Sequence, residues 1–372
     1  MNAYCIALIT NLIFNGSPLY EEEVGKIGTP IRLTNPAQFL KAGEAYFDHG
    51  TKRVIFQAIE HPIEGEEPSS DYSMYIGDLE LNDSQAITGL TSIRMLSKAG
   101  SANTCGWFHP SDDSTVLFAT TTNPTTNADA PGYQRGTGKY RWAFPPEMNI
   151  VVCDLENDDQ TTPLITDEQN YVAEGSWSPD GRHILYCSLA TGDGDIYVKD
   201  QVTGKTHLLV SSIGYDGGPF FSPDGKRITY RSDRRGNDLL QLFVGELTFN
   251  DEGTIVGLSR EFQITDNAHV NWGPFWHPTG QFLLYTTSEV GHHNYEIYII
   301  DADHGAQGNV TKYGTRKRRI THAPKFDGLP VFNSTGHWLM WTSKRETDTS
   351  QLWVAPFVFD VDAAPQDAPL TQ

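Results

Sequence analysis

The stretch Gly217-Gly218-Pro219-Phe220-Phe221-Ser222-Pro223-Asp224-Gly225, followed by Lys226-Arg227-Ile228-Thr229-Tyr230, contains the pattern that decides the fold. A tight turn follows the aromatic residues, because proline presets φ, aspartate bonds its own backbone and glycine takes the left-handed position. Apolar and polar residues alternate after the turn, which is typical of a half-buried strand. The stretch therefore predicts a β-hairpin.

The same pattern of an aromatic residue, a turn and an apolar strand occurs six times along the chain. The turns lie at residues 47–50, 108–110, 177–181, 221–225, 276–280 and 332–336. Successive turns are about 44 to 69 residues apart, which suits a four-stranded propeller blade with loops of varying length. One blade cannot bury its own faces, so the blades must stack around an axis. We predict an all-β chain that forms a six-bladed β-propeller of four-stranded antiparallel blades.

A short segment near the N-terminus is predicted to close the ring. Ile31-Arg32-Leu33-Thr34 repeats the fourth-strand phrase Arg319-Ile320-Thr321, and the sixth blade supplies three strands before it becomes rich in proline. Residues 31–34 would then form the outer strand of the last blade and leave no sheet edge exposed. The alternative is a disordered N-terminal arm. The predicted organisation is an arm over residues 1–30, a propeller over 31–360 and a tail over 361–372.

Composition limits the classes of partner. The chain of 372 residues has a formal net charge of −20, which argues against nucleic acid and anionic membranes, since both need basic faces. The four cysteines lie far apart, which predicts neither a disulfide framework nor a zinc site. Residues 4–14 are mostly apolar, but the run is too short to span a membrane and has no basic segment before it. We therefore expect no membrane insertion and no clear signal peptide, and the compartment stays open.

Three segments, residues 214–225, 271–278 and 326–332, resemble the TolB-like β-propeller repeat family. The resemblance covers about residues 31–358 and implies the six-bladed fold and a periplasmic or extracellular location. In that family the TolB propeller holds protein partners, while related oligogalacturonate lyases use a metal bound by histidines. About 30 residues before Ile31 are too few for the N-terminal α/β domain of TolB. No G-x-S-x-G motif occurs, so a serine hydrolase of the kind attached to some propellers is not expected.

Acidic residues on the innermost strands are the first candidates for a site. Alignment on the aromatic residue before each turn places Asp216, Asn271 and Asp327 in one layer, with Glu44 and Glu174 two residues closer to the turn. Residues two apart on a strand share a face, so all five are expected to point into one funnel. This oxygen-rich set predicts a site for Ca²⁺ or Mg²⁺. The alternative is that each acid bonds the backbone of a neighbouring loop and fixes blade packing.

The candidate ligand-binding residues lie in loops and near strand ends. They are Arg94, Tyr140, Arg141, Arg231, His269 and Asn271. The arginines could balance the acids or clamp an anionic group, although such residues often join neighbouring blades or face solvent. The pair Tyr140 and Arg141 belongs to a long loop, residues 120–146, and suits stacking on a sugar or peptide. The alternative is an insertion without a binding role.

The sequence favours a binding module that takes a protein or carbohydrate ligand in its central funnel. One alternative is a metal-assisted polysaccharide lyase or hydrolase of the oligogalacturonate type, in which His269 and His292 or His293 would act with a funnel arginine. Another is an accessory propeller within a larger assembly. Convergence of at least three imidazoles on one metal would favour the enzyme. The fold alone does not decide between these functions, because function depends on the site.

Overall fold

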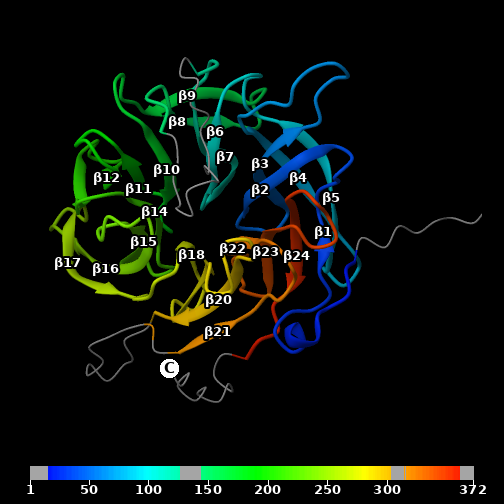
Figure 1. Ribbon diagram of the computed structural model, residues 1–372. Coiled ribbons are helices and arrows are strands. Elements are labelled where there is room, and N and C mark those ends of the chain that lie inside the picture. Colours follow the sequence, from blue (N-terminus) through cyan, green and yellow to red (C-terminus); the bar gives the residue numbers. More distant parts are fainter. Residues whose placement is uncertain (1–15, 126–143, 303–313, 315, 361–372) are drawn as a thin grey trace, which may run out of the picture.

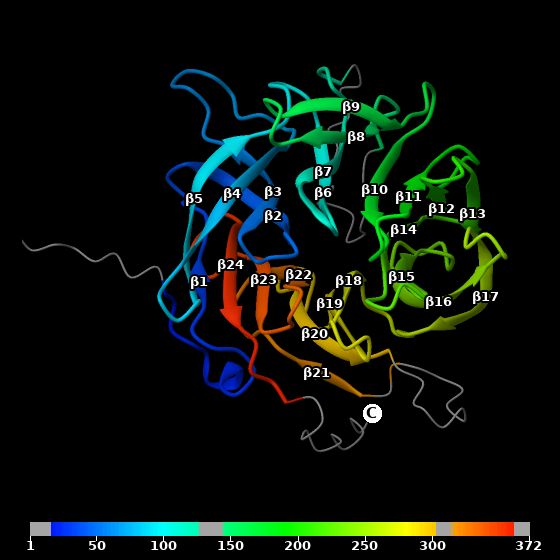
Figure 2. The same ribbon diagram turned by 180° about the vertical axis from the view of Figure 1, so that it is seen from behind.

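The computed structural model describes residues 16–125, 144–302, 314 and 316–360. Its strands form six four-stranded antiparallel sheets. Figure 1 and Figure 2 show these sheets arranged in a ring. Apart from the short 3₁₀ helix η1 (Glu21–Glu23), the described part of the chain contains no helix. The predicted six-bladed β-propeller is confirmed.

Five blades are built from strands in chain order, and the sixth takes its outer strand from the N-terminus. The innermost strands are β2 (Phe39–Phe47), β6 (Asn103–His109), β10 (Val172–Trp177), β14 (Asp216–Phe221), β18 (Asn271–Trp276) and β22 (Asp327–Phe332). The second strands are β3 (Arg53–Glu60), β7 (Asp112–Thr120), β11 (His183–Ser188), β15 (Arg227–Ser232), β19 (Phe282–Thr287) and β23 (Trp338–Ser343). The third strands are β4 (Ser73–Leu81), β8 (Asn149–Asp154), β12 (Asp195–Asp200), β16 (Gln241–Phe249), β20 (Glu296–Asp301) and β24 (Gln351–Pro356). The outer strands are β5 (Ile87–Met95), β9 (Gln160–Ile165), β13 (Thr206–Val210), β17 (Ile255–Gln263), β21 (Lys317–Arg319) and β1 (Ile31–Arg32).

The N-terminal strand closes the ring as predicted. Strand β1 pairs antiparallel with β24, with Ile31 opposite Val354 and Arg32 opposite Trp353. Two residues later, the Thr34 hydroxyl donates to Gln351 Oε1 at 2.8 Å and accepts from the Leu352 backbone N–H at 2.9 Å. The segment thus satisfies backbone groups that an exposed edge of the last blade would leave unpaired.

The residues before β1 also pack on the last blade. Glu23, at the end of η1, is fully buried, and Arg345 Nη2 donates to its Oε1 at 2.8 Å. The same guanidinium nitrogen lies 3.4 Å from Asp327 Oδ2. One buried cation therefore joins the N-terminal segment to the innermost strand of the sixth blade.

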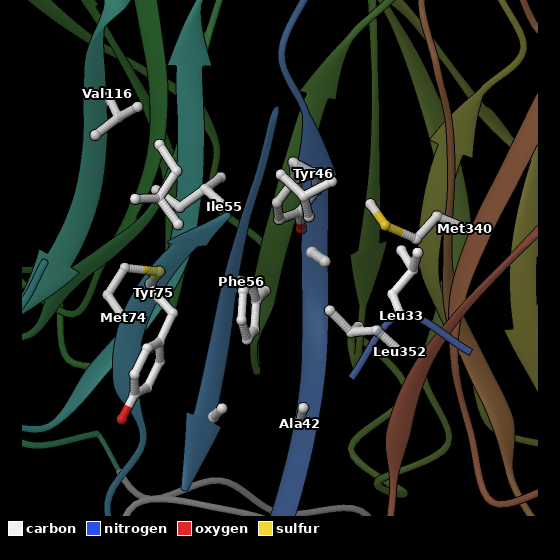
Figure 3. Packing of buried hydrophobic residues seen from close by; sticks show 14 of the residues in the cluster. Leu33, Ala42, Tyr46, Ile55, Phe56, Met74, Tyr75, Val116, Met340 and Leu352 are labelled. Carbon is white, nitrogen blue, oxygen red and sulfur yellow. The ribbon is translucent and has the colours of Figure 1, made fainter. Parts of the chain in front are cut away.

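The core lies between neighbouring sheets. In Figure 3, Ile55 and Met74 are on the side of the first blade that faces Val116 of the second blade. Gly106 of β6 permits this close approach, because a Cβ there would come within 2.6 Å of Ile55 Cδ1. On the other side of the first blade, Ala42 lies near Leu352 of the sixth blade in the same view. Apolar side chains thus hold consecutive blades face to face.

Among the described residues, no helix is long and apolar enough to cross a membrane.

Candidate functional site in the central cavity

Every innermost strand contains a β-bulge at the same position, three residues before the aromatic residue of the turn. At this position the backbone takes a positive φ in all six blades. The residues, here called the bulge ring, are Glu44 (φ 40°), Cys105 (53°), Glu174 (61°), Gly218 (59°), Gly273 (57°) and Leu329 (54°). A left-handed conformation is unfavourable for residues with a Cβ and tends to persist where it serves a site. Four side chains carry that strain in this ring.

The bulge ring lines a central cavity of about 460 Å³. Two residues further along four of the strands, the aromatic rings of Tyr46, Trp107, Phe220 and Phe275 meet across the propeller axis. Their centroids lie 4.8 Å apart for Tyr46 and Trp107, 5.2 Å for Trp107 and Phe220, and 5.7 Å for Phe220 and Phe275. Tyr46 and Phe220 also line the cavity. This aromatic plug fills the axis and gives the cavity a floor.

Aromatic side chains also form one wall of the cavity. Trp272, Tyr295 and Phe326 all line it, with ring centroids 5.9 to 6.4 Å apart. Lys325 lines the cavity as well, and its ammonium pairs with the fully exposed Asp348 at 2.9 Å. The cavity therefore combines a broad apolar surface with a few charged groups, the usual composition of a ligand pocket.

Glu174 forms a closed polar cluster at the cavity. The Tyr215 hydroxyl donates to Glu174 Oε1 at 2.6 Å, and the Gly218 backbone N–H donates to its Oε2. Arg231 Nη2 lies 3.3 Å from Glu174 Oε1 and donates to the Tyr215 hydroxyl at 2.8 Å. Arg231 is itself buried, so this charge pair is well shielded from solvent.

Glu44 has a different environment, although it occupies the same ring position. Its carboxylate accepts from the Cys105 thiol at 3.1 Å, the Tyr46 hydroxyl at 3.2 Å and the Thr104 hydroxyl at 3.4 Å. Burial raises the pKa of Glu44, because the ionised form loses its hydration, and the hydrogen bond from Cys105 offsets part of this rise. The thiol stays protonated, since burial raises the pKa of Cys105 well above its usual value. Glu44 therefore lines the cavity with only neutral side-chain groups donating hydrogen bonds to its carboxylate.

The structure divides the five residues expected in one funnel. Glu44 and Glu174 line the cavity, whereas Asp216, Asn271 and Asp327 are fully buried and are not among its lining residues. The reason is the bulge: Glu44 and Glu174 are themselves at its left-handed position, which breaks the alternation of side chains on which the expectation depended. Across the bulge, a ring residue and the residue two positions before it consequently do not share a face.

The three remaining residues hydrogen-bond within the protein, and only Asp216 accepts from loop backbone as the structural alternative described. Asp216 accepts from the Ser212 backbone N–H at 2.8 Å. Asn271 Nδ2 donates to the Asn267 side chain at 2.9 Å and to the carbonyl of His269 at 3.0 Å. Asp327 Oδ1 accepts from the Trp341 indole at 3.0 Å. Each contact ties the start of an innermost strand to neighbouring backbone or side chains.

The other predicted residues fall in different places. Arg231 lines the cavity, whereas Arg94 lies on the outer strand β5 and pairs with Asp159 at 2.9 Å. His269 does not line the cavity, although His292 and His293 do. Tyr140 and Arg141 lie outside the described residues. Within the described ranges, no group of three or more His, Cys, Asp and Glu side chains could hold a metal ion.

Sequence reasoning missed Cys105 and Gln57, which both line the cavity. Cys105 had a signal, since it stands three residues before Phe108, as Glu44 stands three before Phe47 and Glu174 three before Trp177. Counting from the turn in every repeat gives the whole bulge ring. Gln57 had no comparable signal, because it is on a second strand and its position depends on pairing with Gly43.

We expect Asp216→Asn to flatten the pH dependence of stability. Burial raises the pKa of Asp216 from its usual 3.8 to about 6, so the native state keeps a proton that the unfolded chain releases. The stability from this proton is fully present below about pH 4 and is lost as the pH rises through 6, by up to about 3 kcal/mol. Urea unfolding of both proteins between pH 4 and 7 measures the effect.

A matched control is Asp83→Asn, at an exposed carboxylate in the turn after β4. Its unfolding free energy should follow the pH dependence of the wild type. If Asp216→Asn and the wild type also give parallel curves, the protonated state assigned to Asp216 is wrong.

Comparison with known proteins adds relatives of the same fold. No family model matches the chain. The chain is 30% identical over 135 residues to an uncharacterised protein of Agrobacterium fabrum, a match that covers 35% of this chain and 42% of that protein. It is 28% identical over 99 residues to the Tol-Pal system protein TolB of Francisella tularensis, which covers 27% and 22% respectively. The matched regions thus span less than half of these curated relatives.

Two solved structures support the same assignment of the fold. TolB from Acinetobacter baumannii superposes with a TM-score of 0.51 at 17% identity, over 83% of this chain and 64% of that chain. A protein provisionally assigned as TolB from Agrobacterium tumefaciens gives a TM-score of 0.51 at 16% identity, over 85% and 90%. At these identities the likeness shows the fold alone.

Proposed function

Because the chain has a TolB-like six-bladed β-propeller fold, we propose that it is a binding module that takes its ligand in the central cavity. The observation that carries this proposal is the bulge ring, where all six blades turn a left-handed residue toward one cavity of about 460 Å³. Backbone strain repeated at one place is typical of a site, and this volume suits a small ligand or the end of a peptide.

The walls of the cavity fit binding. Its aromatic surface, with Trp272 and Tyr295, offers contact area to a ligand, while Glu44 and Arg231 provide polar groups that could orient it. The aromatic plug at its base means that a ligand would enter and leave by the same end. Relatives named for a Tol-Pal system support a protein ligand, whose chain end would occupy the cavity.

The metal-assisted lyase has no comparable support. His292 and His293 line the cavity, but His269 does not. His292 Nδ1 is 3.1 Å from the Tyr295 hydroxyl, so one of the two ring nitrogens is already engaged in a hydrogen bond. No observation on the described residues favours this second function.

We expect Gly273→Leu to weaken ligand binding sharply, because the new side chain would narrow the cavity. Gly273 belongs to the bulge ring, and a Cβ there would meet no atom closer than 3.6 Å, the nearest being Leu329 Cδ2. Gly218 is unsuitable, because a Cβ there would come within 2.3 Å of Arg231 Nη1. The substitution copies the residue that the sixth blade carries at this position. The measurement is a thermal-shift screen of small molecules and short peptides against both proteins.

The matched control is Gly273→Ala, which has the same left-handed backbone at a cost of about 1 to 2 kcal/mol but leaves the cavity open. Ligands that raise the melting temperature of the wild type should still do so for Gly273→Ala and fail with Gly273→Leu. Ligands that bind all three proteins equally would place the binding site elsewhere and contradict the proposed function.

A further inference from the structure

The two ring glutamates differ in how their charge is balanced. Glu174 lies 3.3 Å from the Arg231 guanidinium. Glu44 has no cation within ion-pair distance among the described residues, and its three side-chain donors are a thiol and two hydroxyls. A thiol is a weak donor, so the half-buried carboxylate of Glu44 is incompletely compensated. Its side of the cavity is thus suited to a positive charge.

Gln57 supplies a second and independent feature on the same side. Its side chain lines the cavity and is only 8% exposed, yet its Oε1 accepts no hydrogen bond from any described residue. Gln57 is paired with Gly43, the residue directly before Glu44. A buried amide oxygen without a donor is uncommon, and one explanation for such an atom is a missing ligand.

We propose that this side of the cavity binds a primary ammonium group carried on an aromatic or apolar body. An ammonium has three N–H donors. Glu44 Oε2, which accepts only from the Thr104 hydroxyl, and Gln57 Oε1, which accepts from no described residue, offer it acceptors. The aromatic wall of the cavity, formed by Trp272, Tyr295 and Phe326, would contact the body of the ligand. This inference rests on the proposed function and specifies the chemistry of the ligand at the same site.

The nearby arginine does not oppose this assignment. Arg231 donates to the Tyr215 hydroxyl at 2.8 Å and pairs with Glu174, and at longer range its charge also lowers the pKa of Glu44 and so favours the ionised carboxylate. With Glu44 ionised, the two glutamates and Arg231 leave one negative charge at the bulge ring. An anionic group would meet that charge, whereas an ammonium would neutralise it.

The test uses three probes of similar shape and different charge: 2-phenylethylamine, 2-phenylethanol and phenylacetate. Titration calorimetry of the full chain at pH 7 should show the amine binding at least about tenfold more tightly than the alcohol, and phenylacetate more weakly than either. Glu44→Gln should weaken binding of the amine about tenfold or more and change binding of the alcohol by less than about twofold. Gln57→Leu should weaken binding of the amine several-fold.

A matched control is Glu80→Gln, which removes the same charge from an exposed position on β4 and should leave all three affinities unchanged. The melting temperature of each variant checks that loss of binding does not reflect unfolding. Equal binding of the three probes, or an amine affinity that survives Glu44→Gln, would overturn the inference. Absence of amine binding to the wild type would overturn it as well.

The failure of this inference is distinguishable from failure of the proposed function. If the alcohol or phenylacetate binds at least as tightly as the amine and Gly273→Leu prevents that binding, the cavity remains the ligand site but not one for ammonium groups. If the screen yields ligands that bind the wild type and Gly273→Leu equally, the cavity is not the ligand site, and the proposed function fails irrespective of charge.

Discussion

Deletion of residues 1–36 should lower the free energy of unfolding by more than about 5 kcal/mol. The deletion removes β1, exposes the edge of β24, and takes away two core side chains, Ile27 and Leu33, which are 1% and 5% exposed. Losing a buried aliphatic side chain typically costs about 2 to 5 kcal/mol, and net stability is commonly only about 5 to 15 kcal/mol. Thermal unfolding followed by circular dichroism should show a much lower melting temperature or no cooperative transition.

Deletion of residues 1–15 alone is the control, because it leaves η1, Ile27 and β1 in place. Its melting temperature should lie well above that of the longer deletion. An unchanged melting temperature after deletion of residues 1–36 would show that the N-terminal strand does not hold the ring closed.

The second large effect is expected for Arg345→Met. Arg345 is 1% exposed and is the partner of both Glu23 and Asp327, which are 0% exposed. Removing the guanidinium leaves two buried carboxylates without their cation, and breaking a buried ion pair in this way typically costs about 3 to 5 kcal/mol. Urea unfolding at pH 7 measures the loss.

Arg94→Met is a matched control, since Arg94 also contacts a carboxylate through two nitrogens but has an exposed side chain. It should change stability by less than about 1 kcal/mol. Adding Glu23→Gln and Asp327→Asn to Arg345→Met should restore part of the loss, because the unpaired charges are then gone. Equal effects of Arg345→Met and Arg94→Met would contradict the role assigned to the buried network.

The architecture follows from local features of the sequence. The turn residues, such as Pro223, Asp224 and Gly225, fix where each hairpin reverses, and the apolar strand after each turn must be buried against a neighbour. The pattern occurs six times at intervals typical of propeller blades, and a closed ring buries the apolar strands of all six copies. The closing strand was also readable, because residues 31–34 repeat a fourth-strand phrase that the last blade otherwise lacks.

The site was only partly readable from the same repeats. Glu44, Glu174 and Arg231 were identified and line the cavity, but Asp216, Asn271 and Asp327 do not. Strict alternation along a strand placed all the acids on one face, and a one-residue bulge is invisible to that rule. Position relative to the turn was the better guide, since the bulge occurs at the same distance from the turn in every blade.

The sequence by itself determined the number of blades, their strand order and the closure of the ring, because turns and alternating strands are set by neighbouring residues. Only the tertiary structure decided which side chains meet at the axis and how each is paired. Glu44 and Glu174 occupy equivalent positions in their repeats, yet Arg231 reaches one of them and neutral donors surround the other. That difference arises from contacts between residues far apart in the chain, and repetition within the sequence carries no information about them.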